Sequence, residues 1–118
     1  MAEWVFDKQG RAELIYDRDC FRSKIGKVVA WISNNNVYGT NGRHRGWFEK
    51  GIFYDSNNRA VGFVRDATGS LPSRPGLGGI PSTPLLFARP LKPLFAGTPA
   101  RPGPGGWSDE DLKGYLGG

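Results

Sequence analysis

A repeat of sixteen residues fills the first half of the chain and restricts it to a small set of folds. The four windows follow one another without a gap and read MAEWVFDKQGRAELIY, DRDCFRSKIGKVVAWI, SNNNVYGTNGRHRGWF and EKGIFYDSNNRAVGFV. In each window, strand-forming apolar residues flank a short polar turn. A repeat of this kind indicates one small structural unit built four times, whose copies must pack together to bury a common core.

The turn residues predict one β-hairpin in each window. The turns open at Asp7, Ser23, Gly39 and Asp55 and close at Gly10, Gly26, Gly42 and Asn58. Gly and Asn tolerate a positive φ, so this pattern predicts a type I turn followed by a G1 bulge. A single hairpin is marginally stable in water, whereas a closed ring of hairpins buries apolar surface and leaves no exposed strand edge. We therefore predict an all-β domain at residues 1–66, with four consecutive hairpins closed around a central axis as a shallow barrel or flower.

The second half of the chain has a different composition. All nine prolines fall between Pro72 and Pro104, accompanied by many glycines, and regular structure is not expected in such a segment. Residues 67–106 are therefore predicted to form an extended Pro/Gly-rich arm. Because this arm contains several apolar residues, it is expected to dock on its own barrel or on a neighbouring subunit. Pro-x-x-Pro spacing at 81–84 and 90–93 leaves a polyproline ligand as the alternative.

Residues 107–116 are predicted to form a short amphipathic helix or motif. Ser108 is expected to cap this helix, Asp111 to complete a capping box, and Trp107 to pack onto Leu112. Such a segment after a Gly-rich hinge serves either to tie down the chain end or to engage a partner.

Length and composition set further limits. A chain of 118 residues has room for one domain, and the small repeat region needs either the second half of the chain or neighbouring subunits to complete its core. We predict a homo-oligomer. Cys20 is the lone cysteine and cannot form an internal disulfide, which fits a reducing compartment. No leader or transmembrane stretch is apparent, so a cytoplasmic location is expected.

The hairpin signature, Asp-x-x-Gly/Asn-Arg/Lys, resembles that of the four-fold β-flower family over residues 4–64. Hairpin units such as 54–63 and 6–12 are also similar to those of the tubby, phospholipid-scramblase and LURP-one-like barrels. Those relatives wrap a central helix, and the repeats of this chain contain no apolar helix of that length. The resemblance to the β-flower family implies the fold and no known activity, and the resemblance to the other barrels implies an association with lipids.

The residues that carry chemistry are few. His44 is the one histidine, Cys20 the one cysteine, and the acidic residues are scattered mainly at turns. Catalysis needs a nucleophile, a base or a metal in a defined arrangement. We therefore predict a protein that is not an enzyme, with no catalytic residues, metal or cofactor. His44 is expected to be a strand residue that faces the axis.

Two columns of apolar residues form the candidate binding site. Symmetric hairpins without a central helix leave a hole that something should fill. The residues expected around it are Val5, Phe21, Val37 and Phe53 at the fifth position of the repeat, and Trp31, Trp47 and Phe63 at the fifteenth. The predicted function is a non-enzymatic binding or assembly module that holds an apolar small molecule, lipid or peptide at its centre. Alternatively, the arm fills the hole and the protein is chiefly structural.

A column of basic residues supports a second hypothesis. Each turn is followed by a cation, namely Arg11, Lys27, Arg43 and Arg59, and the chain has a net charge of +5. Ring closure would set these cations at equivalent positions, where they would form an anion-binding rim for nucleic acid or an anionic membrane. In the simpler interpretation, each long side chain covers apolar surface while its charged group stays in water.

Overall fold

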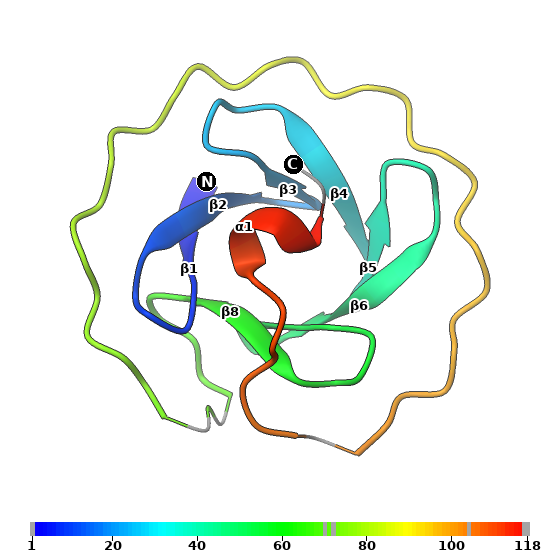
Figure 1. Cartoon of the computed structure of the whole chain (residues 1–118). Coiled ribbons are helices and arrows are strands. Elements are labelled where there is room, and N and C mark those ends of the chain that lie inside the picture. Colours follow the sequence, from blue (N-terminus) through cyan, green and yellow to red (C-terminus); the bar gives the residue numbers. More distant parts are fainter. Residues whose placement is uncertain (1, 70, 72, 104, 117–118) are drawn as a thin grey trace.

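Eight strands form a closed antiparallel barrel in the computed structural model, which describes residues 2–69, 71, 73–103 and 105–116 (Figure 1). Each strand pairs with the next in the chain, and β8 pairs with β1. The strands are β1 (Ala2–Phe6), β2 (Ala12–Asp17), β3 (Cys20–Arg22), β4 (Val28–Ser33), β5 (Asn36–Gly39), β6 (His44–Glu49), β7 (Ile52–Tyr54) and β8 (Ala60–Val64). They make four hairpins, β1–β2 to β7–β8, which we number 1 to 4. The predicted fold, a ring of four consecutive hairpins, is confirmed.

The hairpin tips have the predicted turn geometry. In hairpin 1, the amide of Gly10 donates to the carbonyl of Asp7 and the amide of Asp7 to that of Arg11, both at 2.9 Å. Gly10 has a φ of 81°, and a register shift between Val5 and Phe6 marks the bulge. Because the other three hairpins repeat these bonds and the positive φ, each sixteen-residue window folds in the same way.

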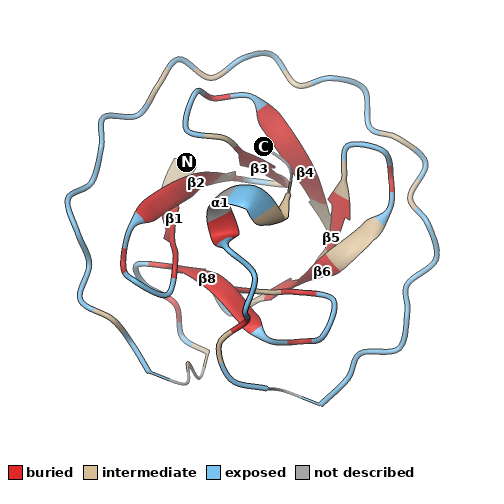
Figure 2. Ribbon diagram, viewed as in Figure 1, coloured by how far each residue is buried: buried red, intermediate tan, exposed pale blue. Residues whose placement is uncertain are grey.

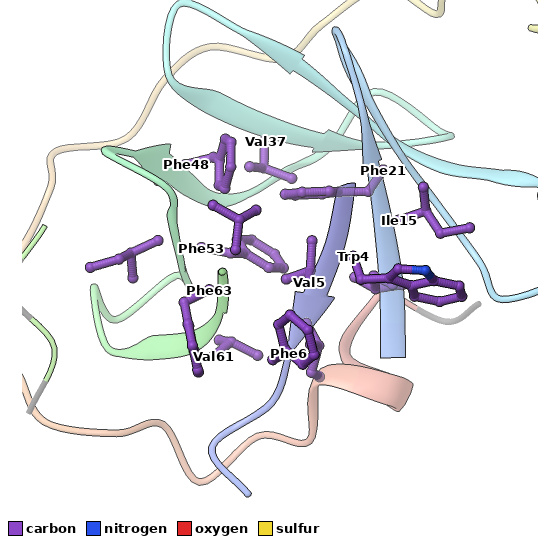
Figure 3. Packing of buried hydrophobic residues seen from close by; sticks show 14 of the residues in the cluster. Trp4, Val5, Phe6, Ile15, Phe21, Val37, Phe48, Phe53, Val61 and Phe63 are labelled. Atoms are coloured by element: carbon purple, nitrogen blue, oxygen red, sulfur yellow. The ribbon is translucent and has the colours of Figure 1, made fainter. Parts of the chain in front are cut away.

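The centre of the barrel is filled with side chains. Val5, Phe21, Val37 and Phe53, at the fifth position of each repeat, have no exposed surface. The rings of Phe21 and Phe53 lie 5.0 Å apart at the axis. Figure 3 shows these residues packed together with further valines and phenylalanines from neighbouring strands. The barrel therefore has a solid middle and two mouths, one at each end of its axis.

The arm runs around the outside of the barrel and passes the tip of every hairpin (Figure 1). Its amides donate to the carbonyl oxygens that close the four turns: Gly78 to Gly10, Phe87 to Gly26, Ala96 to Gly42 and Gly105 to Asn58. The donors are nine residues apart, whereas the acceptors are sixteen residues apart. Each nine-residue segment of the arm thus covers one hairpin, and the arm does not enter the barrel.

The second half of the chain completes the core. Leu71 and Leu86 pack against the main apolar cluster, and Phe95 packs against a smaller cluster formed by Cys20, Val28 and Trp31. Figure 2 shows buried strands surrounded by an arm whose residues are largely exposed. The second half of the chain covers the core of the repeat region, so the core does not need neighbouring subunits to complete it. The homo-oligomer stays a prediction.

The C-terminal helix, α1 (Leu112–Tyr115), is shorter than predicted. Ser108 does not cap it: its hydroxyl donates to the carboxylate of Asp55, and the helix begins after Asp111, which makes no side-chain capping bond. Trp107 forms a backbone bridge to Ala60 on β8, and its ring lies 6.1 Å from that of Phe63; its packing onto Leu112 stays a prediction. Within the described part of the chain, no helix is long and apolar enough to cross a membrane.

Candidate functional site

One mouth of the barrel is closed by α1, which lies across the axis in Figure 1. Leu112 is buried under this helix, with 1% of its surface exposed. The hydroxyl of Tyr115 accepts the amide of Ser56 at 3.0 Å and donates to the carbonyl of Arg45. The guanidinium of Arg45 in turn lies 4.7 Å from the centre of the Tyr115 ring. These contacts hold α1 to hairpins 3 and 4, and we call it the plug.

The opposite mouth is an open hollow of about 390 Å³. Its floor consists of the residues at the sixteenth position of each repeat, Tyr16, Ile32, Phe48 and Val64. Aromatic contacts join this floor to the core, since the ring of Phe48 lies 4.7 Å from Tyr16 and 5.2 Å from Phe21. The floor is therefore packed directly onto the core and consists mainly of apolar side chains.

The rim of this open mouth is polar. It carries the charged residues Glu3, Lys50 and Asp66 together with Asn35 and Thr68. Burial, followed by the nearby charges of Glu3 and Asp19, raises the pKa of Tyr16, so its hydroxyl stays protonated and can donate a hydrogen bond. An apolar floor with a few polar groups around it is typical of sites for small molecules.

The seven apolar residues predicted to surround a ligand are not brought together in one cavity. Val5, Phe21, Val37 and Phe53 form the packed layer beneath the floor. Trp31, Trp47 and Phe63 lie on the outer face of the barrel under the arm, where Lys92, Arg101 and Arg74 approach their rings to 5.4, 5.3 and 5.5 Å. That these residues themselves bind a ligand stays a prediction.

Strand alternation is the signal that identifies the floor. Neighbouring residues of a strand point to opposite sides of the sheet, so positions fifteen and sixteen of the repeat cannot both face the axis. The tryptophans at position fifteen favour this position as a ligand site in the sequence, but in the structure it faces the arm. Position sixteen, with Tyr16, Ile32, Phe48 and Val64, faces the mouth.

The basic column is spread over the tips of four separate hairpins (Figure 1). Arg11, Lys27, Arg43 and Arg59 are all exposed. The Arg11 Nε atom donates to Asp7 at 3.0 Å, and Arg59 lies 3.9 Å from Asp109. The four cations therefore do not converge on one point, and their role as an anion-binding rim stays a prediction.

His44 faces outward, so the expectation that it faces the axis is wrong. Its ring lies 5.4 Å from Tyr38 and 4.9 Å from Trp47, and its Nε2 atom is 3.0 Å from the side-chain oxygen of Asn36. The bulge after each turn shifts the alternation and places this position under the arm. Burial lowers the pKa of His44. Among the described residues, no three His, Cys, Asp or Glu side chains gather as a metal site would require.

A cluster of charges fastens the arm to hairpin 2. The carboxylate of Asp17 forms ion pairs with Arg22 at 2.8 Å and Arg89 at 3.1 Å, and Lys92 lies 2.8 Å from Asp19. Arg22, which is buried, also donates to the carbonyl of Phe87 in the arm. We call these residues the arm clamp: Asp17, Asp19, Arg22, Arg89 and Lys92.

The comparisons with known proteins agree with this architecture. The model of a family described as 4-fold beta flower protein matches residues 3–116 of the chain. The match includes the arm and α1 as well as the four hairpins. Neither a curated protein nor a solved structure matches the chain significantly.

Proposed function

The chain belongs to the 4-fold beta flower family, and from the geometry of its open mouth we propose that it is a non-enzymatic binding module. The ligand is an apolar small molecule, a lipid or an apolar peptide side chain, and it is held in the mouth opposite the plug. One observation carries this proposal: the hollow of about 390 Å³ has an apolar floor and a polar rim.

The size of the hollow fits this role. Pockets for small molecules measure roughly 300–1,000 Å³ and combine apolar walls with a few polar groups that orient the ligand. Tyr16, Ile32 and Phe48 provide the apolar contact area, and Lys50 and Asp66 on the rim provide charges of both signs. The packed layer below gives the floor a fixed shape, which reduces the entropy cost of binding.

The position of the plug supports the same assignment. At the other mouth, α1 inserts Leu112 into the ring of strands and covers Phe53 with Tyr115, whose rings lie 5.8 Å apart. The side chain of Leu112 is thus an apolar group that already packs against inward-facing side chains at one mouth. The open mouth offers a comparable ring, and a ligand would seat there in the same manner.

A charge placed on the floor tests the proposal. In Ile32→Glu, a carboxylate replaces part of the apolar floor, and an apolar ligand should be lost because the buried charge must be desolvated. Native mass spectrometry of the gently purified protein should show a discrete extra mass on the wild-type chain that is absent from the variant.

Leu91→Glu is the matched control, because Leu91 lies on the arm and is 97% exposed. This variant should carry the same extra mass as the wild type. A ligand retained by Ile32→Glu contradicts the proposal. A ligand lost instead on reversing the charge of Arg43, far from the floor, would favour binding of a polyanion by the basic column.

A further inference from the structure

The aspartate that opens hairpin 1 is fully satisfied. One oxygen of the Asp7 carboxylate accepts the amides of Gln9 and Arg11, each at 2.9 Å. The other accepts the guanidinium of Arg11 at 3.0 Å. The tip of this hairpin is therefore built around a carboxylate that two amides and a cation surround.

Hairpin 4 repeats this arrangement with a different third partner. The Asp55 carboxylate accepts the amides of Asn57 and Arg59 at 2.9 and 3.0 Å. Its second oxygen accepts the hydroxyl of Ser108, which comes from the segment that leads to the plug. A carboxylate at this position of the repeat thus has a defined set of donors.

Hairpin 2 has the same backbone but lacks the carboxylate. The amide of Ser23 donates to Lys27 at 2.8 Å and that of Gly26 to Ser23 at 2.9 Å, which matches the turn of hairpin 1. The Ser23 hydroxyl is buried and has no hydrogen-bond partner among the described residues. Within the same part of the chain, no side chain accepts the amides of Ile25 and Lys27, and no acid pairs with Lys27.

A hollow of about 290 Å³ lies beside this tip, between hairpin 2 and the end of the plug. Ile25, Val28, Val29 and Leu116 form its apolar wall, and Ser23, Lys27 and Thr40 its polar side. Ile25 is 65% exposed, so part of its apolar side chain is open to the hollow and to solvent. The plug leaves this gap because its hydrogen bonds run to hairpins 3 and 4.

We propose that this hollow binds a small amphiphile with a carboxylate head group. The carboxylate takes the place of the missing aspartate side chain and accepts hydrogen bonds from the amides of Ile25 and Lys27 and from the hydroxyl of Ser23. The ammonium of Lys27 neutralises it, and hydrogen bonds between charged groups are the stronger kind. The apolar tail lies against Val29 and Leu116.

The charge and size of the hollow agree with this ligand. None of the described residues that line it is acidic, so its field favours an anion. Its volume lies just below the usual range for small-molecule pockets, which fits a short alkyl or aryl chain rather than a long lipid tail.

Calorimetric titration with octanoate tests the site. Octanoate should bind. Acetate lacks the tail and octanol lacks the charge, so each should bind with an affinity at least about tenfold lower. Equal binding of octanoate and octanol overturns the proposal, because the carboxylate would then contribute nothing. The absence of octanoate binding overturns it as well.

Ser23→Asp is the decisive variant. It supplies the carboxylate found at the same position in hairpins 1 and 4, so the variant should fold at least as stably as the wild type while octanoate binding falls by about tenfold or more. Lys27→Gln should weaken binding to a similar degree. Arg43→Gln, the equivalent change on hairpin 3, is the control and should leave binding unchanged.

The two candidate sites can be told apart with the same probe. Octanoate that still binds to Ser23→Asp with wild-type affinity but not to Ile32→Glu occupies the open mouth, and this outcome overturns the assignment to hairpin 2. The reverse pattern supports the assignment, whatever the fate of the proposed function of the mouth.

Discussion

Three glycines at the hairpin tips are required for two separate reasons. Gly10, Gly26 and Gly42 have φ values of 81°, 89° and 86°, a region in which other residues are strained. In addition, a Cβ atom at these positions would lie 1.9–2.3 Å from a carbonyl oxygen of the arm. The fourth tip uses Asn58, whose side-chain amide donates to the carbonyl of Pro102 at 2.8 Å. The tips are therefore docking points as well as turns.

Gly42→Ala should destabilise the protein by about 2 kcal/mol or more, because the methyl group adds backbone strain and displaces the arm at Leu94. Urea unfolding followed by tryptophan fluorescence measures the change. Gly97→Ala is the control, since a Cβ there meets nothing within 4 Å, and it should alter stability by less than about 0.5 kcal/mol. Equal urea midpoints for the two variants would show that close packing of the arm on the hairpin tip does not contribute to stability.

Among the elements, hairpin 2 and the arm are joined by ionised carboxylates. Burial alone would raise the pKa of Asp17, but hydrogen bonds from Arg22 and Arg89 outweigh it and the pKa is lowered. The hydrogen bond from Lys92 lowers the pKa of Asp19. Lowered carboxylate pKa values stabilise the folded state above the ordinary aspartate pKa of about 3.9, and this stabilisation is lost as the pH falls through the folded-state values.

The urea midpoint should therefore be steady near neutral pH and fall below about pH 4 as the arm clamp is protonated. Asp19→Asn removes one of these carboxylates, so its midpoint should be lower than that of the wild type at pH 7 and should depend less on pH. Parallel pH profiles for the two proteins would mean that Asp19 does not contribute to the clamp.

The hairpins could be predicted from the sequence because their turn chemistry is local. The Pro-x-x-Pro motifs at 72–75, 81–84, 90–93 and 99–102 are nine residues apart, which is the spacing of the arm's contacts with the hairpin tips, but this spacing alone does not show what the arm lies on. Three segments place a cation before the second proline, and these cations meet the aromatic rings of hairpins 2, 3 and 4. The remaining segment has Thr83, and the remaining hairpin has Ile15 in place of an aromatic residue.

The candidate sites could be predicted only in part. The apolar columns and the basic column are visible in the repeat, whereas the choice of an open mouth depends on where α1 docks. That docking rests on contacts between residues far apart in the chain, such as Tyr115 with Arg45 and Ser108 with Asp55. No pattern within either segment predicts such contacts.

The whole molecule is a flat disc of 36 × 36 × 22 Å, held together at its circumference by the arm and at its axis by the plug. Trp31 is only 1% exposed although it lies on the outer face of the barrel, and it packs with Phe95 of the arm. Without the second half of the chain, the outer aromatic residues and the mouth beneath Leu112 would be open to water.

A chain that ends at Asp66 should therefore lose cooperative unfolding and bind the dye ANS, a sign of exposed apolar surface. Calorimetry and dye fluorescence check this outcome. Leu91→Gln in the full-length chain is the control, because Leu91 is already 97% exposed and its change should leave the transition intact. A sharp, dye-free transition in the shortened chain would show that the four hairpins fold without the arm.

The pairing of a sixteen-residue hairpin repeat with a nine-residue arm repeat constrains how hairpins can be added to such a protein by duplication. Each sixteen-residue hairpin is covered by its own nine-residue segment of the arm, encoded in a separate part of the chain. Duplicating one hairpin would leave a tip without its segment, and duplicating one segment would leave a segment without its tip. A fifth hairpin with its own arm segment therefore requires two coordinated duplications at distant sites, which favours a fixed number of four hairpins.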